Sequence, residues 1–162
     1  EGIKFLAKNS RLLDAVKAQN GNPLTQDEIL RIDAEWRAGQ SPQLQTVAQS
    51  HASKYLKHMI RQMSNTYSEA FVTDMLGANV AMFPATSDFW QGDEEAFIEA
   101  YSGGKGQVHI SDVSRDESTQ ATAVKVSVPM LDDSKVIGVL VMGVKLSAIE
   151  AQRLRDLKKQ SN

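Results

Sequence analysis

The sequence contains no cysteine. Disulfide bonds, thiol catalysis and thiolate metal sites are therefore excluded together. This absence does not fix the compartment, because an oxidising environment permits disulfides without requiring them. The 162 residues also lack a basic excess, since 18 Lys and Arg stand against 20 Asp and Glu, for a net charge of -2. General nucleic-acid binding is not expected, because it usually requires a basic face.

A long apolar run is missing as well. The longest, Val136–Val144, falls far short of the roughly 18 apolar residues of a membrane span and is typical of a buried strand. No signal peptide is visible, and the chain begins at Glu1 without an initiator Met. We therefore expect a mature or trimmed product, whose upstream segment would be a signal peptide or a membrane anchor.

Recognisable catalytic and metal-binding motifs are absent too. None of the three histidines lies in a GxSxG or HExxH context. His51 and His58 are seven residues apart, whereas a helical metal pair is usually three or four apart. Asp112, Asp116 and Glu117 lack the spacing of known calcium loops. The sequence thus predicts a protein that is not an enzyme and that uses no metal or cofactor.

Helices are predicted for the N-terminal third. Apolar residues recur at helical spacings within Ile3–Ala18, and the turn at Asn20–Pro23 ends that segment. Thr25 and Glu28 form a capping box for a second helix, which is expected to stop near Gly39.

A longer helix is predicted next. Ser41 is expected to cap it, with Pro42 at its first helical position. The apolar stripe then continues at helical spacing for more than five turns, to Met63. A helix of this length with one apolar face is expected to lie across a sheet.

The remaining sequence predicts an antiparallel sheet. The expected strands are Ala70–Asp74, Asn79–Phe83, Gln107–Ser111, Ala121–Pro129 and Val136–Val144, with helices over Asp93–Tyr101 and Ser147–Leu157. Short turns link most of these strands. We therefore predict an α+β fold, in which the long N-terminal helix packs on a five-stranded antiparallel sheet.

Over about Leu44–Leu146 the sequence resembles the PAS-like extracytoplasmic sensor domains called PDC or Cache domains, of the single-module type. The stretches that carry the resemblance are FVTDMLGANVAMF, TSDFWQGDEEAF, GQVHISDVSRDEST, AVKVSVPMLDD and KVIGVLVMGV. The resemblance implies an N-terminal helical extension over residues 1–40, a sensor domain over 41–146 and a C-terminal helical tail over 147–162.

The resemblance also implies a function. Such domains bind small ligands on the side of the sheet facing away from the long helix, at the periplasmic or extracytoplasmic side of the bacterial inner membrane. Signal transduction or chemotaxis input is expected, with an organic acid, an amino acid or an amine as ligand. The sequence lacks the aromatic–arginine signature of the amino-acid-binding relatives, so the ligand class of those relatives is not carried over to this chain. The alternative is a free-standing periplasmic binding or protein-interaction protein. A membrane tether outside this chain and a homodimer through the long helix are both compatible with the family.

The segment Thr86–Glu95 is the first candidate site, as a lid over the sheet. Phe89 and Trp90 are the residues that local structure least requires, and they either plug the core or wall a ligand. Asp88 is either an N-cap, with Gln91 closing the turn, or an acceptor of a hydrogen bond from a ligand amine. Asp93 is expected to cap the helix that follows.

The second group of candidates lies on the strands. Val124, Val126 and Val128 are predicted to face one side of their strand, with Lys125 and Ser127 on the other. Lys125 is either solvated or, beneath a lid, a partner for a ligand carboxylate. The complete set of predicted ligand-binding residues is Phe71, Thr73, Asp88, Phe89, Trp90, Lys125 and Ser127.

Overall fold

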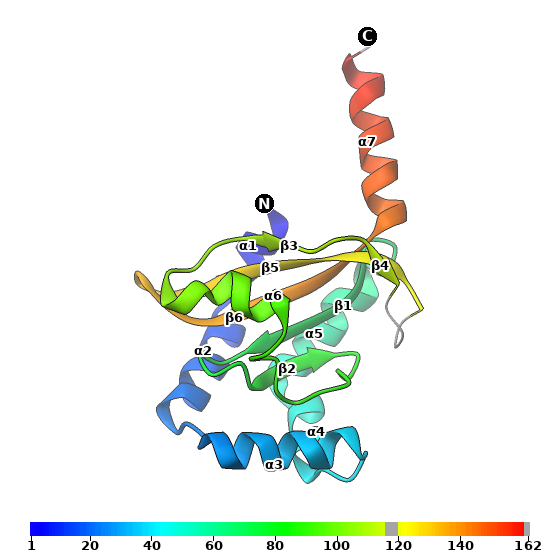
Figure 1. Ribbon diagram of the computed structural model, residues 1–162. Coiled ribbons are helices and arrows are strands. Elements are labelled where there is room, and N and C mark those ends of the chain that lie inside the picture. Colours follow the sequence, from blue (N-terminus) through cyan, green and yellow to red (C-terminus); the bar gives the residue numbers. More distant parts are fainter. Residues whose placement is uncertain (116–119, 161–162) are drawn as a thin grey trace.

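The computed structural model describes residues 1–115 and 120–160. Helices fill the N-terminal third, and the two longest strands lie near the C-terminus (Figure 1). The helices are α1 (Gly2–Leu6), α2 (Ser10–Gly21), α3 (Gln26–Arg37), α4 (Pro42–Gln49), α5 (His51–Gln62), α6 (Glu95–Tyr101), the short 3₁₀ helix η1 (Ser102–Gly104) and α7 (Leu146–Gln160). The strands are β1 (Tyr67–Thr73), β2 (Asn79–Phe83), β3 (His109–Ile110), β4 (Ser114–Arg115), β5 (Thr122–Asp132) and β6 (Lys135–Lys145).

All of these strands join one antiparallel sheet, in the order β2-β1-β6-β5-β3, with β4 also paired to β5. The rich β-branched content of β6 suits its place between β1 and β5, where its residues 136–143 are all buried. The predicted α+β architecture with an antiparallel sheet is confirmed. Several details differ: β1 begins at Tyr67 rather than Ala70, β4 lies where no strand was predicted, and β5 extends to Asp132 rather than ending at Pro129.

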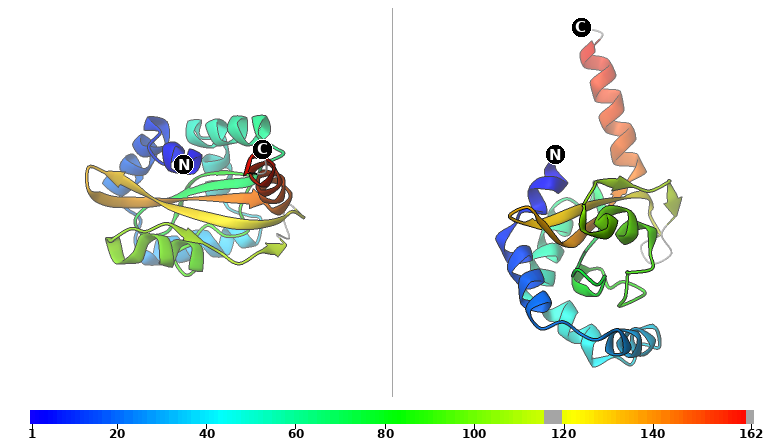
Figure 2. Two further views of the ribbon diagram at one scale, coloured as in Figure 1. Left: turned by 90° about the horizontal axis from the view of Figure 1, so that it is seen from above. Right: turned by 60° about the vertical axis from the view of Figure 1, so that its left-hand side comes forward.

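Helices cover both faces of the sheet and divide the core in two. Figure 2 shows α2 and α5 on one side of the sheet and α6 on the other. The cluster under α2 and α5 includes Leu12, Val16, Leu56, Ile60, Val72, Leu140 and Met142. The opposite cluster includes Ile29, Trp36, Phe71, Met82, Phe89, Phe97 and Val141, so α3 and α6 pack on that side.

The predicted continuous helix to Met63 is wrong, because the chain breaks at Ser50 into α4 and α5. Ser50 has extended backbone angles, and its side chain caps α5 by accepting from the Ser53 amide. The Ser53 hydroxyl donates to the Val47 carbonyl at 2.6 Å and accepts from the Met82 amide of β2 at 2.9 Å. Ser53 thus gives the Val47 carbonyl a second donor, beside the Ser50 amide at 3.2 Å, and satisfies an amide at the edge of the sheet.

Two smaller predictions about helix ends are also wrong. The segment Ile3–Ala18 is not continuous, because α1 ends at Leu6 and α2 begins at Ser10, capped by Asn9, which accepts from the Arg11 amide at 3.0 Å. Asp93 does not cap α6, whose N-cap residue is Glu94 with no side-chain cap bond. The capping box of Thr25 and Glu28 at the start of α3 is confirmed.

Helix α7 follows β6 directly and projects away from the body of the protein (Figure 1). None of its residues 146–160 is buried. Ile149, Leu154 and Leu157 are 40%, 61% and 51% exposed. Within residues 1–115 and 120–160, no helix combines the length and the apolar character needed to cross a bilayer.

Candidate functional site

A row of side chains crosses four strands on the face of the sheet opposite α5. Phe71 of β1 pairs with Val141 of β6, which pairs with Ser127 of β5, which pairs with His109 of β3. Directly paired residues of an antiparallel sheet point to the same side. Ser127 and Phe71, two of the predicted ligand-binding residues, therefore share this face with His109, which the sequence analysis did not select.

This face of the sheet carries polar atoms that are buried without a partner. Among the described residues, the Ser127 hydroxyl, the Thr73 hydroxyl and the Nε2 atom of His109 have no hydrogen-bond partner. Ser127 and Thr73 are both 0% exposed. Leaving such a group unpaired in an apolar setting costs about 1–3 kcal/mol, so native proteins usually supply a partner. A bound polar molecule would do so.

His109 has one weak electrostatic neighbour on α6. Its Nε2 atom lies 3.6 Å from a carboxylate oxygen of Glu95, which exceeds hydrogen-bond distance. The Glu95 side chain is 73% exposed, so it remains free to turn towards solvent. His109 thus offers a ring nitrogen to the sheet face without being held by a strong ion pair.

Lys125 supplies a cation on the same face, two residues before Ser127 on β5. It pairs with Gly143 of β6, and its ammonium lies 6.0 Å from the centre of the Phe71 ring. Gly143 carries no side chain, and the space is taken by Ser68 and Glu69, which a Cβ there would approach to within 2.4 Å and 2.8 Å. In the part of the chain that is described, no carboxylate lies within 4.0 Å of this ammonium. The partly buried cation can therefore accept an anionic ligand group.

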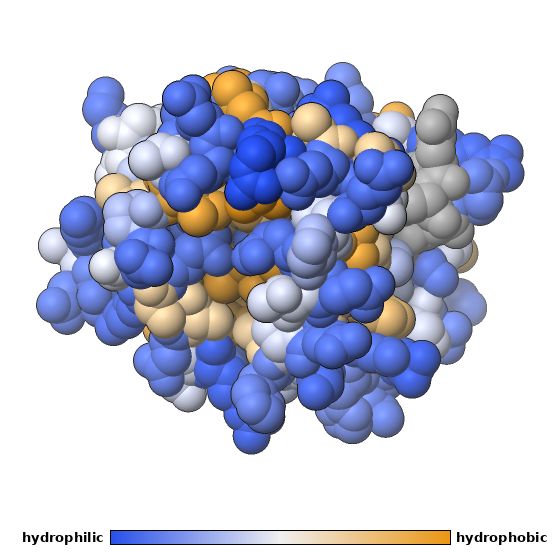
Figure 3. All heavy atoms as spheres, turned by 90° about the horizontal axis from the view of Figure 1, so that it is seen from below, coloured by the Kyte–Doolittle hydropathy of each residue, from blue (hydrophilic) through white to orange (hydrophobic). Residues whose placement is uncertain are grey.

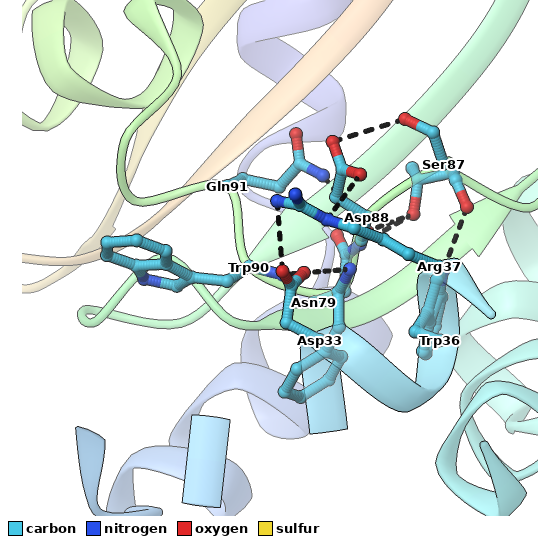
Figure 4. Close-up of polar contacts among 10 residues, drawn as sticks. Asp33, Trp36, Arg37, Asn79, Ser87, Asp88, Trp90 and Gln91 are labelled. Carbon is cyan, nitrogen blue, oxygen red and sulfur yellow. Dashed lines mark hydrogen bonds and ion pairs between the residues drawn. The ribbon is translucent and has the colours of Figure 1, made fainter. Parts of the chain in front are cut away.

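The predicted lid segment is fixed to α3 by Asp33 (Figure 4). One oxygen of this carboxylate, which is 6% exposed, accepts from the amides of Phe89 and Trp90, each at 2.9 Å. The other oxygen lies 2.9 Å from Arg37, one turn further along the helix. The Phe89 amide is buried and the Trp90 amide is partly buried, and neither donates to a neighbouring strand. Asp33 supplies the acceptor that both amides need.

Asp88 belongs to the same network and does not cap a helix. Its carboxylate lies 3.1 Å from Arg37. Its backbone carbonyl accepts from the side chains of Asn79, Thr86 and Gln91, at 2.7–3.0 Å. The prediction that Gln91 closes the turn is confirmed, and the Asp88 carboxylate is already occupied by an arginine.

Phe89 and Trp90 are both accounted for by packing. Phe89 is 0% exposed and lies against Trp36, with ring centres 5.3 Å apart. The Trp90 indole N–H donates to the Leu76 carbonyl at 2.9 Å, and its ring covers Gly92, where a Cβ would meet it at 2.3 Å. These contacts correspond to the core-plug interpretation of the two aromatics.

The structure brings the predicted site residues together in two groups. Phe71, Thr73, Lys125 and Ser127 share the central face, whereas Asp88, Phe89 and Trp90 lie beyond the β2 edge. β2 and β5 are three strand spacings apart, which is about 14 Å. The second group therefore forms a rim beside the face and does not cover Lys125 directly. On the side of the molecule where α3 lies, Figure 3 shows apolar side chains deep between hydrophilic ones.

Two residues of this region were missed by the sequence analysis, and each carries a signal. Asp33 interrupts the apolar stripe of Ile29, Ile32 and Trp36 on α3, and an acid on a buried helix face requires a partner. His109 carries a weaker signal: the alternation of its strand places it on the face opposite to Val108 and Ile110.

A groove lies elsewhere, along the base of α7. It measures about 930 Å³ and is lined mostly by α7 itself, together with Asn65, Thr66 and Val144. One wall of this groove is the projecting helix α7, whose residues are all partly or fully exposed. The groove is therefore open to solvent, and buried polar groups do not line it. We therefore do not assign the ligand site there.

No candidate metal site is found within residues 1–115 and 120–160, because no three histidine or acidic side chains there lie close enough together to hold a metal ion. Of the acidic residues considered for calcium, Asp116 and Glu117 lie outside the described residues. His51 and His58 are both exposed on α5.

Comparison with known proteins gives the fold. No protein-family model matches the sequence, and no curated protein matches it. Among solved structures, the sensor domain of the V. cholerae histidine kinase DctB matches with a TM-score of 0.56 at 16% identity, covering 92% of this chain and 48% of that one. This chain thus spans about half the length of the DctB domain.

Two further matches have TM-scores below 0.5. The E. coli DcuS sensor domain matches with a TM-score of 0.48 at 19% identity, over 78% of this chain and 92% of that one. The ligand-binding domain of the Campylobacter jejuni chemoreceptor Tlp3, solved with L-valine, matches with a TM-score of 0.45 at 14% identity, over 84% and 50%. The fold assignment rests on the DctB domain: this chain has the PDC/Cache fold predicted from its sequence.

Proposed function

We propose that this chain is an extracytoplasmic sensor domain that binds a small polar metabolite and provides the input for signal transduction or chemotaxis. The single observation that carries the proposal is the row of unpartnered polar atoms on the face opposite α5. The likeness in fold to a sensor domain supports it. Ligand binding, with no catalytic step, is the role assigned to the face.

The chemistry of the face favours a ligand with an anionic group and at least one hydrogen-bonding group. Lys125 would attract the anion as a point charge, while Ser127, Thr73 and His109 would bond to hydroxyl, amine or carbonyl groups. Phe71 would pack against the apolar part of the ligand. Asp88, Phe89 and Trp90 would form the rim, held to α3 through Asp33.

The signal would pass from the ligand site along β6 into α7. The same strand carries Val141 and Gly143 beneath the site and then runs without a loop into α7 at Leu146. A ligand that favours one arrangement of β5 and β6 would shift the population of α7 positions. The exposed apolar residues of α7 favour this receptor interpretation over the free-standing alternative, because a partner helix would cover them.

A thermal-shift screen of organic acids, amino acids and amines tests the proposal. A compound that binds the native state at 100 times its dissociation constant adds about 2.7 kcal/mol of stability. Lys125→Met should weaken a carboxylate ligand roughly tenfold or more, because a hydrogen bond to a charged group contributes about 1.5–3 kcal/mol. The matched control is Lys135→Met, the same change at an exposed position. The proposal is wrong if both variants bind a true ligand equally well.

A further inference from the structure

The exposed side of α5 carries only positive charge. Lys54, Lys57 and Arg61 follow one another at helical spacing, with His58 between them, and all four are exposed. From Trp36 to Ser68 the sequence contains no Asp or Glu. We name Lys54, Lys57 and Arg61 the basic stripe. In a chain whose net charge is -2, this is a strongly uneven distribution.

An aromatic ring contacts the basic stripe, and among the described residues no carboxylate pairs with it. Lys57 and Arg61 both lie over the Phe83 ring, at 5.7 Å and 5.8 Å from its centre. Arg11 of α2 lies beside the stripe, over the Tyr55 ring at 5.5 Å. Within residues 1–115 and 120–160, no carboxylate forms an ion pair with any of these cations. The Phe83 ring thus attracts the charged groups of Lys57 and Arg61, while both residues remain exposed to water.

The opposite side of the molecule is acidic. Residues 86–104 contain Asp88, Asp93, Glu94, Glu95 and Glu99 and no Lys or Arg. Helix α6 within this segment and helix α5 lie on opposite sides of the sheet (Figure 2). The protein therefore has a charge polarity perpendicular to the sheet, which would orient it on any charged surface.

We propose that the basic stripe docks the protein on an anionic membrane surface through lipid phosphate groups. The apolar side chains of α5, which include Leu56 and Ile60, are already buried in the core, so the helix offers charge without an apolar anchor. Lysine is depleted at protein–protein interfaces, whereas clusters of Lys and Arg attract anionic lipid headgroups. Docking through α5 also leaves the ligand site on the other side of the sheet, away from the membrane.

Self-association fits the observations less well. A symmetric dimer through α5 would bring two basic stripes together, and like charges would oppose it. Stacking the stripe of one copy on the acidic side of another would cover the ligand face and would not close into a defined oligomer. Both arrangements remain measurable outcomes of the test.

Vesicle co-sedimentation tests the proposal with the complete chain. The probes are vesicles of phosphatidylcholine alone and of phosphatidylcholine mixed with phosphatidylglycerol, each at low and at high salt. The test variant is Lys54→Gln, Lys57→Gln, Arg61→Gln. The control variant is Lys105→Gln, Lys158→Gln, Lys159→Gln, which removes three exposed cations elsewhere and gives the same net charge.

We expect wild-type binding to the anionic vesicles only, with loss of binding at high salt. The stripe variant should bind roughly 100-fold more weakly, about fivefold for each cation removed, and the control should stay close to wild type. Circular dichroism and the melting temperature establish that both variants fold. The proposal is overturned if wild type does not bind, if both variants lose binding equally, or if light scattering reveals a dimer or polymer that the stripe variant abolishes.

Discussion

Replacing Asp33 with alanine should destabilise the protein more than any other change at an acidic residue of α3. The carboxylate accepts from the amides of Phe89 and Trp90 and pairs with Arg37. Asp33→Ala leaves both amides without an acceptor in a site that is 6% exposed at Asp33 and 0% at Phe89.

The magnitude follows from these contacts. Each buried donor left unsatisfied costs about 1–3 kcal/mol. Arg37 adds little, because its side chain is 55% exposed and still pairs with Asp88. We therefore expect a loss of about 2–5 kcal/mol, a large share of the roughly 5–15 kcal/mol that stabilises a typical domain. Asp33→Asn keeps an oxygen acceptor and should lose only about 1 kcal/mol.

Urea denaturation measures these differences, and amide hydrogen exchange locates them. In Asp33→Asn and wild type the amides of Phe89 and Trp90 should remain protected, and in Asp33→Ala they should exchange faster. The control is Glu35→Ala, on the same helix, whose exposed ion pair with Arg31 at 2.7 Å should contribute no more than about 0.5 kcal/mol. If Asp33→Ala and Glu35→Ala lose the same small amount, Asp33 does not hold the segment and the rim described above is wrong.

Three further perturbations have defined outcomes. Ser53→Ala should cost about 1–3 kcal/mol in urea denaturation, because the buried Met82 amide loses its acceptor, whereas the Val47 carbonyl keeps the Ser50 amide as a donor at 3.2 Å; a loss below about 0.5 kcal/mol would contradict the account of the helix break. Gly138→Ala should destabilise by at least about 1–3 kcal/mol, since a Cβ would lie 2.1 Å from the Thr73 carbonyl, and an unchanged melting temperature would show that the strands can separate there. Burial raises the pKa of Asp74 above its ordinary value, against the opposing effect of its bonds from Gln19, Ala78 and Leu76. A carboxyl group with a raised folded pKa binds its proton more tightly when folded, so its contribution is complete below the unfolded pKa and is lost as pH rises through the folded pKa. Wild type should therefore gain stability relative to Asp74→Asn as pH falls from about 7 to about 4, and a constant difference across that range would refute the assignment.

Local signals predicted the parts of the fold that depend on neighbouring residues. The capping box of Thr25 and Glu28 joins residues three apart, and the alternation of β5 correctly placed Lys125 and Ser127 on one face. The break at Ser50 could not be predicted in this way, because it depends on the amide of Met82, 29 residues from Ser53. An apolar periodicity that continues through the break concealed it.

In the candidate site, too, the local features were predicted, whereas features that depend on contacts distant in the sequence were not. Thr73 and Ser127 were placed on the correct strands, yet the partner of Ser127 across the sheet, His109, depends on the register of β3 against β5. Phe89 and Trp90 stood out because their local sequence does not require two aromatics. Their partners Trp36 and Leu76 lie 53 and 14 residues away in the chain, so only the tertiary structure reveals that packing accounts for them.

The most direct test of the central claim is a crystal structure with the compound that gives the largest thermal shift. We predict that the ligand lies on the face opposite α5, with its anionic group in contact with the Lys125 ammonium and another polar group bonded to Ser127 or His109. A ligand bound in the groove along α7, or one that contacts none of these three side chains, would contradict the account.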